Sequence, residues 1–127
     1  MTVDYLNFYK DQIVLVTGGA GAIGSNLVRA LSHTGAKKVI ILDNLISSYE
    51  WNIPNLPNVL FVKGDITNDI DLKRVFNEKP TIIFHLAAFF ANQNSVDYPE
   101  TDLLVSGLGT IKVLEYSVLC GGIKRFV

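Results

Sequence analysis

An apolar run that ends in a glycine-rich turn constrains this chain more than any other feature. Residues 12–17 have the composition of a buried strand, and Gly18, Gly21 and Gly24 follow in a turn that opens a helix. Such a turn leaves the first helical N–H groups without intrahelical partners and directs the positive end of the helix dipole at the same place. A pyrophosphate suits that place. The segment predicts a dinucleotide-binding turn, with an ordinary strand-to-helix turn as the alternative.

Each glycine is expected to serve a different purpose. Gly18 would make the tight turn, Gly21 would let the backbone approach the phosphates, and Gly24 would let the helix pack closely on the strand. The spacing is G-x-x-G-x-x-G, whereas the better-known dinucleotide fingerprint is G-x-G-x-x-G.

A carboxylate stands at the expected distance from this turn. The apolar residues 38–42 end in Asp43, about 20 residues after Gly24. A carboxylate accepts hydrogen bonds from the adenosine ribose hydroxyls and repels a 2′-phosphate, so Asp43 predicts NAD rather than NADP. The alternative is a solvated turn residue.

Length and charge fit one small domain over residues 1–127 and exclude several partners. The 11 Lys and Arg residues nearly balance the 12 Asp and Glu residues, so neither a nucleic acid nor an anionic membrane surface is expected as a partner. Residues 1–10 lack a signal-peptide pattern, and the apolar residues 81–91 are too short to span a bilayer. We therefore expect no membrane partner and a cytoplasmic protein.

The histidines and the cysteine are assigned no chemistry. Cys120 has no partner for an internal disulfide, and neither His33 nor His85 has ligands at metal-site spacing, so no metal site is predicted. His85 lies between apolar residues in a predicted strand and is interpreted as structural rather than as a general base.

Strand-like and helix-like segments alternate along the chain. This rhythm predicts an α/β fold with a doubly wound parallel sheet of order 3-2-1-4-5. We expect three helices. The first covers residues 21–35 and the third covers residues 99–120. The second begins after a cap at residues 67–69 and ends before Pro80, and its apolar positions are Ile70, Leu72, Val75 and Phe76. The expected strands are residues 12–17, 38–43, 59–63, 81–86 and 123–127, with a polar loop at 44–58.

Five ordered motifs resemble the extended short-chain dehydrogenase/reductases. They most resemble the NAD-dependent sugar epimerase/dehydratase branch, which includes the UDP-glucose 4-epimerases, and the similarity extends from residue 11 to residue 127. The resemblance implies a Rossmann-type sheet, a bound NAD and the N-terminal part of such an enzyme. The motifs are residues 17–24 (Thr-Gly-Gly-Ala-Gly-Ala-Ile-Gly), 42–45 (Leu-Asp-Asn-Leu), 64–66 (Gly-Asp-Ile), 85–88 (His-Leu-Ala-Ala) and 109–115 (Gly-Thr, then Val-Leu-Glu).

The resemblance also assigns the cofactor contacts. Ser47 and Ser48 are expected to reach phosphate or ribose from the loop after the second strand. The residues that it places at the pyrophosphate and the adenosine ribose are Gly18, Gly21, Ala22, Ile23, Asp43 and Asn44.

Two further groups of residues complete the implied cofactor site. Asp65 and Ile66 resemble the pair that flanks adenine, in which the carboxylate accepts from the exocyclic amine and the aliphatic side chain covers one face. The alternative for Asp65 is a helix cap. Leu86, Ala87 and Ala88 resemble the strand end beside the nicotinamide ribose, where small side chains leave room for the cofactor.

Two positions depart from the family pattern. Ser106 stands where the epimerases usually have an asparagine that helps to hold the cofactor, and it remains a candidate cofactor contact. Phe90 stands where UDP-galactose epimerases carry a lysine that contacts NAD.

No catalytic residue is predicted within the 127 residues. In the family, a Ser or Thr follows the fifth strand, and a Tyr-x-x-x-Lys pair comes later, where the lysine lowers the tyrosine pKa so that the phenolate can take a sugar hydroxyl proton. None of the five tyrosines is followed by a lysine four positions later. We expect a sheet truncated at its fifth strand, without the nucleotide-sugar pocket, and no turnover by this chain alone.

Two functions stay open on the sequence. The favoured one is the NAD-binding part of a nucleotide-sugar epimerase or dehydratase that works by transient hydride transfer to NAD, because the chain stops inside a predicted core strand. The alternative is a stand-alone dinucleotide-binding module without catalysis. The sugar nucleotide, and the choice between epimerase and dehydratase, stay open too.

The expected helix at residues 99–120 carries apolar side chains nearly all round. Such a pattern fits either a helix buried in a core or one that also joins two subunits. The family resemblance places this helix in a dimer interface, so a homodimer is expected.

Overall fold

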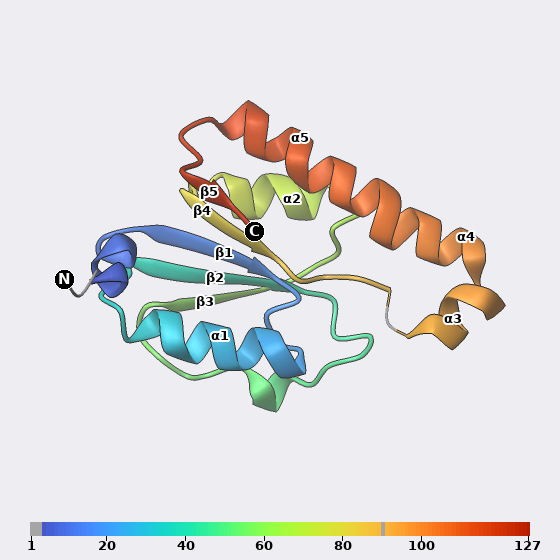
Figure 1. Cartoon of the computed structure of the whole chain (residues 1–127), viewed down its shortest axis with the longest axis horizontal. Coiled ribbons are helices and arrows are strands. Elements are labelled where there is room, and N and C mark those ends of the chain that lie inside the picture. The colour runs from blue at the N-terminus through green and yellow to red at the C-terminus, as the bar shows by residue number, and fades with distance from the viewer. Residues whose placement is uncertain (1–3, 90) are drawn as a thin grey trace.

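Five parallel strands form one sheet, in the order β3-β2-β1-β4-β5 (Figure 1). The computed structural model describes residues 4–89 and 91–127. The order confirms the predicted 3-2-1-4-5 arrangement, with β1 at its centre. The strands are β1 (Ile13–Thr17), β2 (Lys38–Asp43), β3 (Val59–Lys63), β4 (Ile82–His85) and β5 (Arg125–Phe126).

Helices cover both faces of the sheet, which explains why its central strands are continuous apolar runs. In β1, Val14 and Val16 pack in the core on the face covered by α1 (Ala22–Ser32), while Leu15 packs in the core on the opposite face. All three side chains are fully buried. Because successive side chains of a strand point to opposite faces of the sheet, this one strand contributes to two separate cores.

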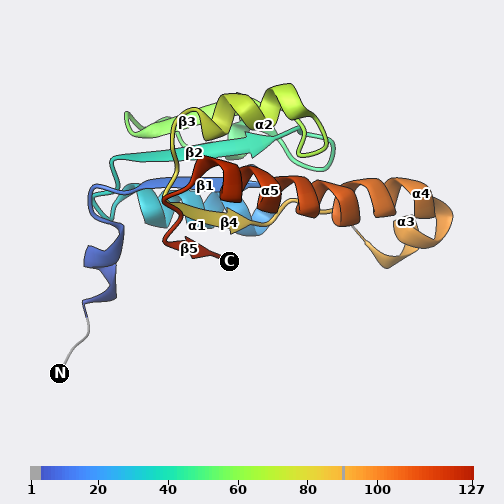
Figure 2. The ribbon, with the colours of Figure 1, turned by 90° about the horizontal axis from the view of Figure 1, so that it is seen from above.

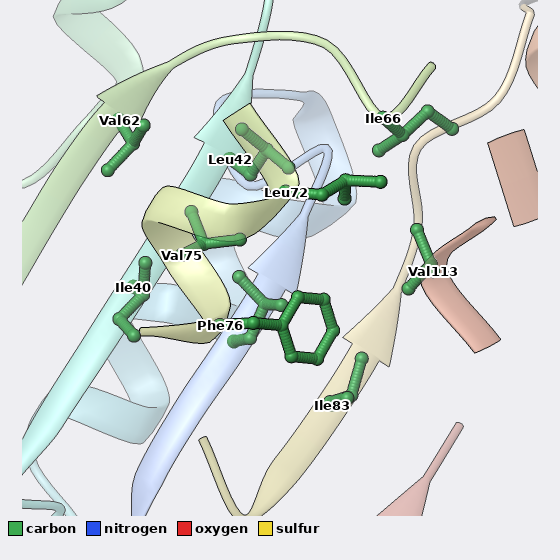
Figure 3. Packing of buried hydrophobic residues seen from close by; sticks show 10 residues of the cluster. Ile40, Leu42, Val62, Ile66, Leu72, Val75, Phe76, Ile83 and Val113 are labelled. Atoms are coloured by element: carbon green, nitrogen blue, oxygen red, sulfur yellow. The ribbon is translucent and has the colours of Figure 1, made fainter. Parts of the chain in front are cut away.

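The second core lies between the sheet and two helices, α2 (Asp69–Phe76) and α5 (Thr110–Cys120). Leu72 and Phe76 of α2 and Val113 of α5 contribute to it, and Figure 3 shows them in one cluster with Ile40 and Ile83 of the strands. The side chain of Asn68 caps α2 by accepting hydrogen bonds from the N–H groups of the first turn.

Helix α1 is shorter than predicted, and one apolar position of α2 is exposed. Helix α1 ends at Ser32 rather than near Gly35, because the next two N–H groups bond to carbonyls three residues back and Gly35 takes a φ of +79°. Ile70 is 70% exposed, since it lies on the outer side of the short helix α2 rather than on its core side.

The chain between β4 and β5 contains more structure than predicted. A short helix, α3 (Asn92–Asp97), precedes the long helix, which consists of α4 (Pro99–Asp102), the π-helical segment η3 (Leu103–Gly109) and α5. The long helix ends at two glycines, Gly121 and Gly122, each with a φ of +71°. Two short 3₁₀ helices, η1 (Tyr5–Tyr9) and η2 (Glu50–Asn52), complete the described elements.

The amino-terminal half of the long helix projects beyond the carboxyl ends of the strands (Figures 1 and 2). The helix over Pro99–Cys120 is long enough to cross a membrane, and an 18-residue window within it is apolar enough, with a mean hydropathy of 1.5. This helix lies outside residues 81–91, and by length and composition alone it is weak evidence for a membrane span. The core helix of a soluble protein passes the same test, although only 17% of the apolar stretch of this helix is buried.

Candidate functional site

A cleft of about 380 Å³ lies at the carboxyl ends of β1 to β4. Every residue predicted to contact the cofactor lines it, with the exception of Ser106. Leu42, Gly64 and Val105 also line the cleft and were not predicted to do so. Leu42 and Gly64 directly precede Asp43 and Asp65, whereas Val105 belongs to the long helix, which only the fold brings to this place. The position agrees with the general rule that α/β sheets bind ligands beyond the carboxyl ends of their strands.

The glycine turn forms the floor of the cleft. Gly18 takes a φ of +70°, and a Cβ there would lie 2.8 Å from the backbone N of Ala87, so the turn requires glycine on two grounds. A Cβ on Gly24 would collide with the carbonyl of Gly18 and lie 2.8 Å from the Cα of Gly19. Gly24 therefore packs α1 against the turn itself rather than against the strand.

The N-terminus of α1 opens into the cleft with free donors. The first helical hydrogen bond runs from the N–H of Ser25 to the carbonyl of Gly21 (2.9 Å), and no side chain caps the helix. The N–H groups of Ala22, Ile23 and Gly24 precede that bond and belong to residues that line the cleft. Gly21 leaves this end open, because a Cβ there would approach only the carbonyl of Gly18 at 3.3 Å.

Asp43 ties the end of β2 to the glycine turn. Its Oδ2 accepts from the N–H of Ala20 (3.0 Å), and its Oδ1 accepts from the N–H of Leu45 and the hydroxyl of Ser48 (both 2.8 Å). A carboxylate offers about four acceptor positions, so one position stays free for a ligand. Ser47 and Ser48 both line the cleft, and Ser48 also supports Asp43.

Asp65 and Asn44 link the ends of the neighbouring strands β3 and β2. Oδ2 of Asp65 accepts from the amide of Asn44 (2.9 Å), and Oδ1 accepts from both the N–H and the hydroxyl of Thr67 (2.8 and 2.7 Å). Partial burial acts to raise the pKa of Asp65, but the hydrogen bonds from Thr67 and Asn44 outweigh it and lower that pKa. Asp65 is therefore a charged acceptor, and Asn68 rather than Asp65 caps α2.

The imidazole of His85, at the end of β4, lies between the end of β1 and the long helix. Its Nδ1 is 2.7 Å from the hydroxyl of Thr17, and its Nε2 is 2.9 Å from the hydroxyl of Thr110. Burial lowers the pKa of His85, which favours the neutral imidazole.

Ser106 does not line the cleft. Its hydroxyl accepts from the N–H of Phe89 (3.1 Å) and donates to Asp102 (2.9 Å), so it holds the chain after β4 against the long helix. Phe90, the other position that departs from the family pattern, lies outside the described residues. Within residues 4–89 and 91–127, no three His, Cys, Asp or Glu side chains gather as a metal site.

Comparison with known families decides the class of protein. The sequence profile described as the NAD dependent epimerase/dehydratase family matches residues 14–127. The chain belongs to this family. The predicted cofactor, NAD, is confirmed at the level of the NAD-dependent family, and the predicted fold is that of its members.

Individual relatives agree with the family assignment. A UDP-glucose 4-epimerase of Mycolicibacterium smegmatis is 43% identical over 111 residues, which cover 84% of this chain and 35% of the relative. The solved structure of the epimerase Mth375 from Methanothermobacter thermautotrophicus is 63% identical with a TM-score of 0.93, covering 97% of this chain and 36% of that one. The Bordetella bronchiseptica enzyme WbmF, solved with NAD+ and UDP, is 34% identical with a TM-score of 0.88, covering 94% and 36%. The chain thus spans about a third of the length of these relatives.

Proposed function

We propose that this chain is the NAD-binding part of a nucleotide-sugar epimerase or dehydratase. The observation that carries the proposal is the meeting of three groups in one cleft: the uncapped N-terminus of α1, the carboxylate of Asp43 and the carboxylate of Asp65. When bound, NAD would supply a hydride acceptor that takes hydrogen from the sugar and returns it. The NAD-bound relative WbmF, solved with UDP, supports the same assignment.

The N-terminus of α1 would bind the pyrophosphate. The N–H groups of Ala22 and Ile23 have no helical carbonyl to bond, and the helix dipole adds positive potential at the same point. Gly21 presents no side chain that would keep the phosphates away.

The two carboxylates would recognise the adenosine. Asp43 has one acceptor position left on Oδ2, which suits a ribose hydroxyl and disfavours a 2′-phosphate. Asp65 likewise keeps one position on Oδ2 beside Asn44, which suits the exocyclic amine of adenine, with Ile66 against the ring. This chain's residues thus favour NAD over NADP.

The opposite end of the cleft would hold the nicotinamide. Leu86, Ala87 and Ala88 line it after β4, and Val105 of the long helix lines it too. These side chains carry no titratable group, so they can place and shield the nicotinamide ring but cannot move a proton. Sugar chemistry would need groups outside these 127 residues, in agreement with the absence of any Tyr-x-x-x-Lys pair.

Dinucleotide titration tests the proposal. Calorimetric titration of the chain should give NAD a lower Kd than NADP, and UDP-glucose or dTDP-glucose supplied with NAD should show no conversion. Equal affinity for NAD and NADP would contradict the assignment of Asp43. Sustained sugar conversion by the purified chain would contradict the absence of catalytic residues.

The long helix supports a homodimer. Its apolar side chains at Leu103, Val118 and Leu119 are 71%, 82% and 79% exposed, and exposed apolar surface of this kind marks interaction sites. Light scattering over a concentration series should give a mass above the 14.0 kDa of one chain. A stable monomer at high concentration would overturn this part of the proposal.

A further inference from the structure

The hydroxyl of Thr17 has its bonding capacity fully used. Its oxygen accepts from the N–H of Ala87 (3.2 Å) and from the N–H of Leu86 (3.1 Å), which Leu86 shares with the backbone carbonyl of Thr17 at the same distance. A hydroxyl has two acceptor positions and one hydrogen, so the remaining contact, to His85 Nδ1 at 2.7 Å, must be a donation from Thr17. Nδ1 of His85 therefore carries no proton.

The other end of the imidazole gives the same answer independently. The hydroxyl of Thr110 lies 2.8 Å from the carbonyl of Ser106, and a carbonyl can only accept, so Thr110 donates its single hydrogen there. Its oxygen must then accept from Nε2 of His85 at 2.9 Å. Both ends require the neutral imidazole with its proton on Nε2, and burial, which lowers the pKa of His85, favours that charge state.

The resulting chain of hydrogen bonds joins three elements that meet at one end of the cleft. Thr17 is the last residue of β1 and directly precedes Gly18, and His85 is the last residue of β4. Thr110 follows the π-helical segment η3, which contributes Val105 to the cleft wall. One imidazole therefore connects the glycine turn, the backbone after β4 and the helix that faces it.

Removing the imidazole would release this arrangement at a defined place. Without Nδ1, the hydroxyl of Thr17 has no acceptor for its hydrogen and can rotate. Its oxygen is then no longer held in the orientation that accepts from the N–H groups of Leu86 and Ala87. Without Nε2–H, the long helix loses its polar link to the sheet at Thr110. Asp43 and Asp65 take no part in the chain of hydrogen bonds, so the adenosine end should keep its geometry.

We propose that His85, as the neutral Nε2–H tautomer, is a positioning residue for the nicotinamide end of the cofactor cleft. It acts through Thr17 on the backbone of Leu86 and Ala87 and through Thr110 on the wall formed by η3. The inference rests on the proposed function, since it assumes that NAD occupies this cleft, but the tautomer itself is a property of the cofactor-free chain.

The first experiment measures the tautomer directly. Long-range nitrogen–proton NMR spectra of the cofactor-free chain should show one histidine with a protonated Nε2 and an unprotonated Nδ1 at pH 7.5. The chain has two histidines, so the spectrum of a His33→Gln variant assigns the signal to His85. A proton on Nδ1, or on both nitrogens, would overturn the proposal without any test of cofactor binding.

The second experiment compares two ligands. We expect His85→Phe and Thr110→Val each to weaken NADH binding by about tenfold, the order of one or two lost hydrogen bonds, while ADP binds as before. ADP carries the adenosine and pyrophosphate but no nicotinamide, so it separates a positioning role from a general loss of structure. Thr110→Ser keeps the hydroxyl and should restore NADH binding.

The outcomes distinguish a wrong role for His85 from a failure of the proposed NAD binding. Equal weakening of NADH and ADP would reduce His85 to a structural residue and overturn the inference. Unchanged NADH binding in both His85→Phe and Thr110→Val would overturn it too, with the proposed function intact. Failure of the unmodified chain to bind either ligand would overturn the proposed function and this inference together, whatever the tautomer.

Discussion

The two ends of the cofactor cleft are built in opposite ways. At the adenosine end, the polar side chains at the carboxyl ends of β2 and β3 already have partners: Asp43 accepts from the backbone N–H of Ala20, and Asp65 accepts from the side-chain amide of Asn44. At the nicotinamide end, the cleft is lined by Leu86, Ala87, Ala88 and Val105. The nearby polar side chains of Thr17 and His85 do not line the cleft and bond to each other and to the backbone. The end proposed for adenosine therefore has its polar groups already in place, whereas the end proposed for nicotinamide is an apolar wall that would need further groups for chemistry.

The contrast separates binding from reaction within one fold. Fixed carboxylates cost little to reorganise when a ligand arrives, so they give affinity and specificity at once. An apolar wall with no titratable group gives neither a proton donor nor a base. Residues that touch the cofactor and residues that transform the sugar can thus come from different parts of a protein, and under the proposed function this chain would supply the first set.

The largest expected effect comes from the glycine turn, which both ends share. Gly18→Ala should unfold the chain or abolish NAD binding, because the left-handed φ costs about 1 kcal/mol or more and the new Cβ would press on the backbone of Ala87. Thermal melting and NADH fluorescence titration measure the two effects.

Gly21→Ala is the matched comparison for Gly18→Ala. Its Cβ would meet only the carbonyl of Gly18 at 3.3 Å, and its φ of −72° is ordinary, so the fold should survive. We still expect weaker NAD binding, since the methyl group stands where the phosphates approach. If the Gly21→Ala variant bound NAD like the unmodified chain, the pyrophosphate would not bind beside Gly21.

Asp43 tests the adenosine end alone. Asp43→Asn should lower the preference for NAD over NADP by about tenfold or more, because it removes the charge that repels a 2′-phosphate while keeping an acceptor oxygen. Stability should fall as well, since the buried amide must satisfy the donors of Ala20, Leu45 and Ser48 with one oxygen.

Calorimetric Kd values for both dinucleotides measure the change at Asp43. Asp71→Asn is a suitable control, because this carboxylate binds the N–H of Asp65 but does not line the cleft. An unchanged NAD preference in Asp43→Asn would show that another group selects the cofactor.

Asn44 should have a smaller effect, because it acts on adenine through Asp65. Asn44→Ala removes the amide that donates to Oδ2 of Asp65 at 2.9 Å, and we expect a loss of affinity for NAD of about fivefold, the order of one hydrogen bond. The same change should raise the pKa of Asp65, since one of the hydrogen bonds that lower it is gone. If ADP and NAD lost affinity unequally, the two ends of the cleft would not be independent.

The fold and most of the cleft were predictable because their signals are local. Continuous apolar runs such as residues 38–42 specify buried parallel strands, and the glycine turn and Asp43 are separated by a fixed length of helix and strand. The π-helical segment was not predictable, since it depends on which carbonyl each N–H selects over residues 103–109. The same holds for Ser106, whose hydroxyl partners are fixed only once the long helix packs beside the chain after β4.

The smallest expected effect is a pH dependence that comes from the nicotinamide end. Burial holds the pKa of His85 below its ordinary value of 6.5 in the folded chain. Between the folded and the unfolded pKa, only the unfolded chain binds the proton, so acid favours unfolding. The free energy of unfolding should be constant in this respect above pH 6.5, fall between pH 6.5 and the lower folded pKa at no more than about 1.4 kcal/mol per pH unit, and level off below the folded pKa.

Asp65 contributes a loss of the same sign, but at a lower pH. Its pKa is lowered from 3.8, so its contribution is lost only below that value, and the decline that begins at 6.5 belongs to His85. Urea unfolding at pH 7.5, 6.5, 5.5 and 5.0 measures the decline, which His85→Gln should flatten and His33→Gln, at an exposed position, should keep. A decline of equal slope in His85→Gln would mean that the buried imidazole is not the titrating group. The pH dependence of stability would then give no support to a neutral His85 that bonds Thr17 and Thr110.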